Sequence, residues 1–200
     1  MNKKRIQAME RLKSVIPKSL LIRIQKQFGA SDIHRWKDIE NIYEDWEERT
    51  EIMASWIPEN SSVLEFGCAR MVLKKHLAPG CIYTPSDIVD RGQGTLVMNL
   101  NEKPRELPKY DVFFFSGVLE YIHDLDWLLS ACTVSCKSLI ASYAISDDTP
   151  VAERRKHGWI NDLTRIEFSR LLDSKGFVVM EQSEWRNQIL VRADRQTNRA

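Results

Sequence analysis

The sequence has few of the features that mark membrane, secreted or metal-binding proteins. No apolar run approaches the roughly 20 residues that a helix needs to span a bilayer. No uninterrupted apolar segment follows the basic stretch Met1–Arg5, so we expect no secretory signal. The four cysteines include no C-x-x-C pair, which argues against a disulfide framework and against a zinc site. We therefore expect reduced thiols, no bound metal and a cytoplasmic location.

Charge is nearly balanced over the whole chain but not along it. The net charge is +1, so no global attraction draws the protein to nucleic acid. Residues 1–28 hold eight lysines and arginines and one acid, whereas residues 32–51 hold eight acids and three lysines and arginines. Apolar residues recur at helical spacing on both sides of Pro17, which predicts two basic amphipathic helices. Such helices suit peripheral binding to an anionic membrane or to a partner protein; the alternative is a helical cap that packs on the main domain.

The remainder of the 200 residues is predicted to form one α/β domain. A helix is expected from about Asp32 to Trp56, with Pro58 beyond its end. From residue 61 onward, short apolar runs alternate with helical segments, which is typical of a largely parallel sheet. The runs lie at 63–66, 81–84, 96–98, 112–115 and 139–143, with helical segments at 72–77 and 118–129. We assign residues 1–58 to an N-terminal helical extension, 59–193 to the α/β domain and 194–200 to a tail.

The C-terminal part contains a helix with clear start and stop signals. Thr164 and Glu167 have the spacing of a capping box, and Gly176 is placed to end the helix in a left-handed conformation. Two strands are predicted after it, at Phe177–Met180 and Gln188–Val191, joined by a short polar segment. A close pair of this kind is expected to be antiparallel.

Acidic residues end the first two predicted strands. Glu65 lies at the end of the first strand, and Gly67 in the next loop allows the backbone to approach a ligand closely. Asp87 ends the second strand, 22 positions after Glu65. An acid at about this spacing is the residue type that accepts hydrogen bonds from ribose hydroxyls. Because the carboxyl ends of parallel strands form the ligand crevice, we expect both acids to face one site.

The segments Val63–Leu77, Tyr110–Tyr121 and Leu163–Phe177, together with Asp87, resemble a class I S-adenosylmethionine-dependent methyltransferase of the small-molecule branch. The resemblance covers about residues 45–193. It implies a doubly wound, Rossmann-like α/β fold whose seven-stranded sheet is mostly parallel with an antiparallel last strand, and S-adenosyl-L-methionine as the cofactor. It also implies the cofactor-binding residues, which are Glu65, Gly67, Cys68, Ala69, Asp87, Ile88, Asn99, Leu100, Ser116 and Gly117.

The first loop departs from the pattern of this family. The family has three glycines there, and this sequence keeps only Gly67, with Ala69 and Met71 at the other two positions. An alanine is tolerable if the backbone at that residue has a negative φ, so we expect Ala69 to be tolerated. The missing glycines also argue against a nicotinamide enzyme, which needs them around the pyrophosphate. No Asn/Asp-Pro-Pro-aromatic sequence follows the fourth strand, which argues against a DNA adenine or protein glutamine acceptor.

One histidine and one long segment are candidates for acceptor chemistry. His123 is a candidate general base, with an ordinary surface or hydrogen-bonded histidine as the alternative. The segment 144–162 follows the fifth strand and is long for a loop between a strand and a helix. Its candidates for binding an anionic or sugar-like substrate are Arg155, His157, Trp159 and Asn161. The alternative is a solvated basic loop anchored by a packed tryptophan.

Two functions are consistent with these patterns. The first is methyl transfer to a small-molecule acceptor, with the hydroxyl of a saccharide-like compound as the most specific form of the hypothesis. The second is a non-catalytic cofactor-binding or scaffold protein of the same fold, which would use residues 1–28 to bind a membrane or a partner. A nucleic-acid methyltransferase would need a basic face beside the crevice, which only residues 1–28 and 154–156 supply.

Overall fold

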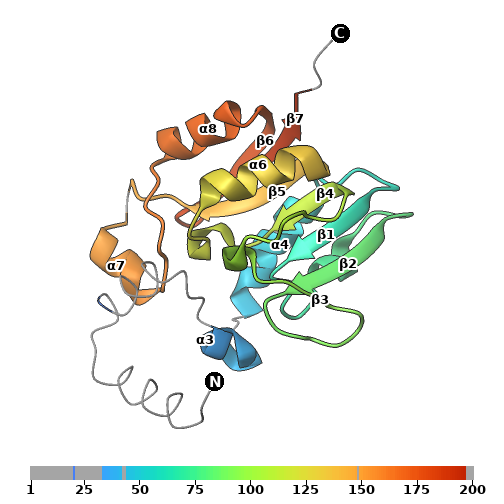
Figure 1. The fold of residues 1–200 in the computed structure, drawn as a ribbon, viewed down its shortest axis with the longest axis horizontal. Helices are drawn as coiled ribbons and strands as arrows, with labels where there is room; N and C mark the ends of the chain where they lie inside the picture. Colours follow the sequence, from blue (N-terminus) through green and yellow to red (C-terminus); the bar gives the residue numbers. More distant parts are fainter. Residues whose placement is uncertain (1–19, 21–32, 42–43, 148, 197–200) are drawn as a thin grey trace.

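The computed structural model describes residues 20, 33–41, 44–147 and 149–196 (Figure 1). Seven strands form one sheet in the order β3-β2-β1-β4-β5-β7-β6. The strands are β1 Ser62–Phe66, β2 Ile82–Asp87, β3 Leu96–Val97, β4 Tyr110–Phe115, β5 Cys136–Ala144, β6 Phe177–Trp185 and β7 Gln188–Arg195. Strand β7 runs antiparallel to both of its neighbours, and the other pairings are parallel. The predicted mostly parallel sheet with an antiparallel last strand is therefore confirmed.

Helices cover both faces of the sheet (Figure 1). On one face, α6 (Leu125–Ser135) and α8 (Arg165–Ser174) pack against a core that includes Phe113 and Phe115 of β4. On the other face, α4 (Glu47–Ala54) and α5 (Leu73–His76) pack with Val112 and Phe114. Alternate residues of a strand point to opposite faces. The continuous apolar run 112–115 thus arises because β4 is buried on both sides.

The single helix predicted over residues 32–56 is wrong. The structure has instead α3 (Ile33–Lys37), η1 (Ile39–Asn41), η2 (Glu44–Trp46) and α4. At the end of helix α3, the carbonyl oxygens of Trp36 and Lys37 accept hydrogen bonds from the Arg91 guanidinium. The Asp38 carboxylate then accepts from the Glu40 N–H at 3.0 Å, a local bond that competes with helix propagation. The two predicted basic helices lie, except for Leu20, outside the described residues.

The C-terminal signals are confirmed. Thr164 and Glu167 form a capping box at the start of α8, and Gly176 has a φ of 77° just after the helix. Strand β7 continues to Arg195, two residues into the segment assigned to the tail, and residues 197–200 lie outside the described part.

Two further segments are more finely divided than predicted. The helix expected over 118–129 is split into η4 (Leu119–Tyr121) and α6, because the Asp124 side chain caps α6 by accepting from the Trp127 N–H. The long segment after β5 contains a helix, α7 (Val151–Lys156). Within the described ranges, no helix has the length and apolar character needed to cross a membrane.

Candidate active site

A cavity of about 900 Å³ opens at the carboxyl ends of β1, β2 and β4. This is the size range of small-molecule sites, and the carboxyl edge is where open α/β sheets bind ligands. All ten predicted cofactor-binding residues line it, as do His123, His157 and Trp159. Arg155 and Asn161 are not among the lining residues. The two strand-end acids, Glu65 and Asp87, thus line one cavity together with the residues of the first loop.

Asp87 is buried at the end of β2 and is held by three donors. Its Oδ2 accepts from the Ala69 N–H and from Arg91 Nε, both at 3.1 Å, and its Oδ1 accepts from the Val89 N–H at 3.2 Å. A carboxylate has about four lone-pair positions, so one acceptor position of Asp87 remains. Arg91 was not predicted as a site residue, although it lies four positions after Asp87 and forms an ion pair with it.

Glu65 is 3% exposed at the end of β1 and accepts a hydrogen bond from the Tyr83 hydroxyl. Burial raises the pKa of Glu65 to about 8; the Tyr83 hydrogen bond opposes this shift, and the nearby Asp87 adds to it. The carboxyl group therefore holds its proton at neutral pH. A cationic ligand beside it would favour the ionised form.

The first loop adopts the left-handed conformation at three positions. Gly67, Ala69 and Met71 have φ values of 70°, 45° and 55°. The expectation that Ala69 is tolerated because of a negative φ is therefore contradicted, and the alanine is strained. A Cβ on Gly67 would lie 2.6 Å from Val118 Cγ2, so this glycine allows close packing against the segment after β4. The Ala69 N–H that donates to Asp87 stabilises the loop.

Ser116 and Gly117, at the end of β4, are held from α4. Arg49 Nε donates to Ser116 Oγ at 3.0 Å, and the Thr50 and Ser116 hydroxyl oxygens lie 2.8 Å apart. A Cβ on Gly117 would lie 2.6 Å from Arg49 Nη2, so only glycine leaves room for this guanidinium. Sequence reasoning missed Arg49 because it lies 67 positions before Ser116, in a stretch dominated by acids.

His123 and the remaining predicted cofactor residues, Cys68, Ile88, Asn99 and Leu100, line the same cavity. Local hydrogen bonds hold some of them. Asn99 caps η3 (Leu100–Glu102) by accepting from the Asn101 N–H, and the Asn101 side chain accepts from the His123 N–H at 2.8 Å. Burial raises the pKa of the Cys68 thiol to about 12, so this cysteine stays neutral. Leu100 is buried, and Ile88 and Leu100 supply apolar wall. The general-base role of His123 stays a prediction.

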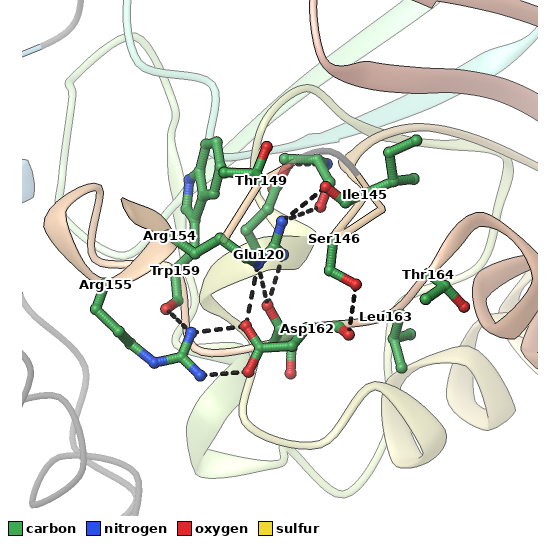
Figure 2. Close-up of polar contacts among 12 residues, drawn as sticks. Glu120, Ile145, Ser146, Thr149, Arg154, Arg155, Trp159, Asp162, Leu163 and Thr164 are labelled. Carbon is green, nitrogen blue, oxygen red and sulfur yellow. Dashed lines mark hydrogen bonds and ion pairs between the residues drawn. The ribbon is translucent and has the colours of Figure 1, made fainter. Parts of the chain in front are cut away.

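Arg154 organises the segment after β5, as Figure 2 shows. Its side chain is fully buried and forms an ion pair with Asp162 at 3.0 Å. Nη1 donates to the Ala144 and Ile145 carbonyl oxygens, and Nη2 donates to the Asn161 carbonyl oxygen. The segment is therefore ordered from within by Arg154, which neither binds solvent as in the solvated-loop alternative nor faces the cavity.

Two of the four predicted substrate residues make internal contacts in this segment. Arg155 donates to the Trp159 carbonyl oxygen and to Asp162, and the Asn161 amide donates to the Leu119 and Ile122 carbonyl oxygens. Trp159 is 8% exposed, and its ring stacks on His157 with 4.7 Å between ring centroids. Trp159 and His157 both line the cavity, so their contact with a substrate stays a prediction.

Helix α3 links the two sides of the cavity and lies at the same end of the molecule as α7 (Figure 1). On one side, the Trp36 and Lys37 carbonyl oxygens accept from Arg91, the partner of Asp87. On the other side, Arg35 Nη1 donates to the His157 carbonyl oxygen at 2.6 Å, and the Trp36 ring meets Tyr121 edge-on at 4.9 Å.

The structure was compared with known proteins, and it resembles several solved structures. No protein-family model and no curated protein matches the sequence. The 1,6-didemethyltoxoflavin-N1-methyltransferase of Burkholderia thailandensis, solved with its substrate and S-adenosylhomocysteine, is 15% identical with a TM-score of 0.64, covering 91% of this chain and 92% of that one. The magnesium protoporphyrin IX methyltransferase of Synechocystis PCC 6803, with bound S-adenosylhomocysteine, is 16% identical with a TM-score of 0.61 and coverages of 90% and 99%.

A human structure gives the same result. N-acetylserotonin methyltransferase in complex with S-adenosylmethionine is 15% identical with a TM-score of 0.65, and the match covers 91% of this chain and 61% of that one. At sequence identities this low, the structural similarity establishes the fold alone. The chain has the fold of class I S-adenosylmethionine-dependent methyltransferases, as the sequence resemblance predicted.

Proposed function

We propose that this protein is an S-adenosylmethionine-dependent methyltransferase that acts on a small-molecule acceptor. The observation that carries the proposal is the pair of buried acids, Glu65 and Asp87, at the carboxyl ends of β1 and β2 in one cavity. The register of β1 and β2 places Glu65 opposite Pro85, two residues before Asp87, so both acids lie on one face of the sheet near the carboxyl ends of adjacent parallel strands. The solved structures of the same fold hold this cofactor or its product, S-adenosylhomocysteine.

The residues present fit the cofactor by the chemistry of their donors and acceptors. Asp87 keeps one acceptor position for a ribose hydroxyl, and a second hydroxyl would replace Arg91 Nε. Glu65 offers a carboxyl group to an amino group, and its raised pKa means that a cation must shift it to the ionised form. The Leu100 and Ile88 side chains offer apolar surface to an adenine ring.

The cofactor would supply an electrophilic methyl group on a positively charged sulfur. The chain would contribute mainly position, which can supply much of the rate of a group transfer. Ser116 and Gly117 are fixed at the end of β4 by Arg49 and Thr50. Tyr121 and Trp159 form aromatic wall beside them and limit access of water to the reacting atoms.

The acceptor is proposed here only as a small molecule. A saccharide-like hydroxyl stays a prediction, and two residues on which it rested, Arg155 and Asn161, are bonded within the protein. Attachment to a membrane or partner through residues 1–28 also stays a prediction, since those residues lie, except for Leu20, outside the described part.

Isothermal titration calorimetry with S-adenosylmethionine and S-adenosylhomocysteine tests the proposal. Asp87→Ala removes two charge-assisted hydrogen bonds to ribose, each worth roughly 1.5–3 kcal/mol, so affinity should fall at least tenfold. Asp90→Ala, an exposed acid three residues later, is the matched control and should change affinity less than twofold. Circular dichroism confirms that both variants fold. Absence of binding by the unchanged protein would overturn the proposal, and binding without transfer to any acceptor would favour the non-catalytic alternative.

A further inference from the structure

Two arginines in the described part of the chain are buried, and their charges are compensated differently. Arg154 forms an ion pair with Asp162, and each of its side-chain nitrogens donates a hydrogen bond. Arg49 is 5% exposed; its Nε donates to Ser116 Oγ and its Nη1 donates to Gln188 Oε1 at 2.8 Å. Among the residues that the structure describes, Arg49 Nη2 has no hydrogen-bond acceptor.

Two of the acids around Arg49 are engaged with other groups. Glu48 accepts from the Trp185 indole N–H at 2.8 Å, and Asp45 forms an ion pair with Arg186. Glu120 is buried nearby, but its Oε1 accepts from the Ala144 N–H, and its Oε2 has no hydrogen-bond partner in the described structure. No ion pair joins Arg49 to any described carboxylate. Burial lowers the pKa of Arg49, and the charge of Glu120 opposes this effect.

A buried guanidinium without a paired anion is costly, so its presence calls for a compensating ligand. Arg49 lies where such a ligand would be useful. Its Nη1 and Nη2 atoms would be 2.8 and 2.6 Å from a Cβ on Gly117, at the end of β4 that lines the cavity. Its guanidinium carbon lies over the rings of Trp46 and Trp185, 6.0 and 5.4 Å from their centroids, and the Arg186 guanidinium lies over the Trp185 ring at 4.2 Å.

We propose that Arg49 anchors the acceptor of the methyl group and that the acceptor is a small aromatic acid. Its carboxylate accepts hydrogen bonds from the guanidinium, and its ring lies in the part of the cavity that Trp46 and Trp185 line. A guanidinium matches a carboxylate in shape as well as in charge, and indole faces suit a planar ring. Gln188, which accepts from Arg49 Nη1, fixes the plane of the guanidinium. This inference rests on the proposed function and makes its acceptor more specific.

The experiment is a calorimetric titration of the protein saturated with S-adenosylhomocysteine. The probes are benzoate, 2-hydroxybenzoate and indole-3-carboxylate, each compared with its neutral amide. We expect at least one carboxylate to bind at least tenfold more tightly than its amide. Arg49→Gln, also saturated with S-adenosylhomocysteine, should abolish this preference, so that each acid and its amide bind with affinities within twofold of each other. Arg165→Gln, which removes an exposed arginine paired with Glu184, should retain the full preference.

Failure of the Arg49 assignment and failure of the proposed function give different results. If the protein binds S-adenosylhomocysteine but no carboxylate more tightly than its amide, the assignment of Arg49 is overturned and the proposed function stands. A carboxylate preference that survives in Arg49→Gln overturns it as well. If S-adenosylhomocysteine does not bind, the proposed function and this inference both fail. Should Arg49→Gln not fold, Arg49→Lys keeps the charge and loses the planar fork. A reduced preference of this variant for the acids supports the assignment, and an unchanged preference overturns it.

Discussion

Glu65 should make the stability of this protein fall as the pH rises. Its folded-state pKa of about 8 lies well above the ordinary value of 4.5, because the carboxyl group is buried. Between these two values the folded state holds a proton that the unfolded state releases. Its contribution to stability is therefore fully present below about pH 4.5 and is lost as the pH rises through about 8. Each unit of pKa difference corresponds to roughly 1.4 kcal/mol, so the change amounts to a few kcal/mol.

Urea denaturation at pH 5, 6, 7 and 8 measures this contribution. Glu65→Gln keeps the shape of the side chain and cannot ionise, so its free energy of unfolding should fall less between pH 5 and 8 than that of the unchanged protein. Glu59→Gln, an exposed acid before β1, is the matched control and should follow the unchanged protein. Equal pH dependence in the protein and in Glu65→Gln would refute the reasoning.

The same group should couple cofactor binding to proton release. If the amino group of S-adenosylmethionine approaches Glu65, its positive charge favours the carboxylate, and a proton leaves on binding below pH 8. Affinity should then rise with pH, by at most about tenfold per unit. Calorimetry in two buffers of different ionisation enthalpy counts the protons released. Glu65→Gln should bind without this release; proton release that is the same in the variant would assign it to another group.

Three further changes test the loop, the segment after β5 and the N-terminus. Ala69→Gly should raise the free energy of unfolding by about 1 kcal/mol because it removes the strain of an alanine in the left-handed conformation. Ala131→Gly within α6 is the control and should lower the free energy of unfolding by a similar amount. Calorimetric melting measures both changes. Arg154→Ala should cost about 3–5 kcal/mol in urea denaturation by leaving three carbonyl oxygens without this donor and Asp162 with Arg155 as its only cation among the described residues, and a loss no larger than that of Arg155→Ala would contradict its structural role. Deletion of residues 1–28 should leave S-adenosylhomocysteine affinity within twofold in calorimetry, and a folded but non-binding truncation would place part of the site there.

The fold was predictable because its signals are local or periodic. Residues 112–115 are all apolar, as expected of a strand that is buried on both faces. The capping box at Thr164 and the glycine at 176 bound one helix by backbone chemistry alone. Asp87 was identified by its separation of 22 positions from Glu65 along the sequence. Adjacent parallel strands carry their last residues to the same edge of the sheet. Each of these inferences needed only a short window of sequence.

The conformation of Ala69 and the burial of Arg154 depend on contacts between distant segments. Nothing within the loop itself required Ala69 to be left-handed; that conformation accompanies a bond from its N–H to Asp87, 18 positions later. Arg154 appeared beside Arg155 and Lys156 as one more surface cation. Its burial follows from the carbonyl oxygens of Ala144 and Ile145 at the end of β5, which need donors once the chain turns away from the sheet.

The acidic stretch 32–51 shows how composition conceals a site. Its eight acids outnumber its three lysines and arginines, and most of the acids that the structure describes lie at the surface. Several of them pair with cations of other elements, as Glu44 does with Arg70 and Asp45 with Arg186. The arginine among them, Arg49, is buried and reaches the end of β4. Glu48 and Asp45 are engaged elsewhere, and no ion pair joins Arg49 to the buried Glu120, so the charge of Arg49 remains available to a ligand. The residue that composition made least noticeable is thus the one placed to select the acceptor.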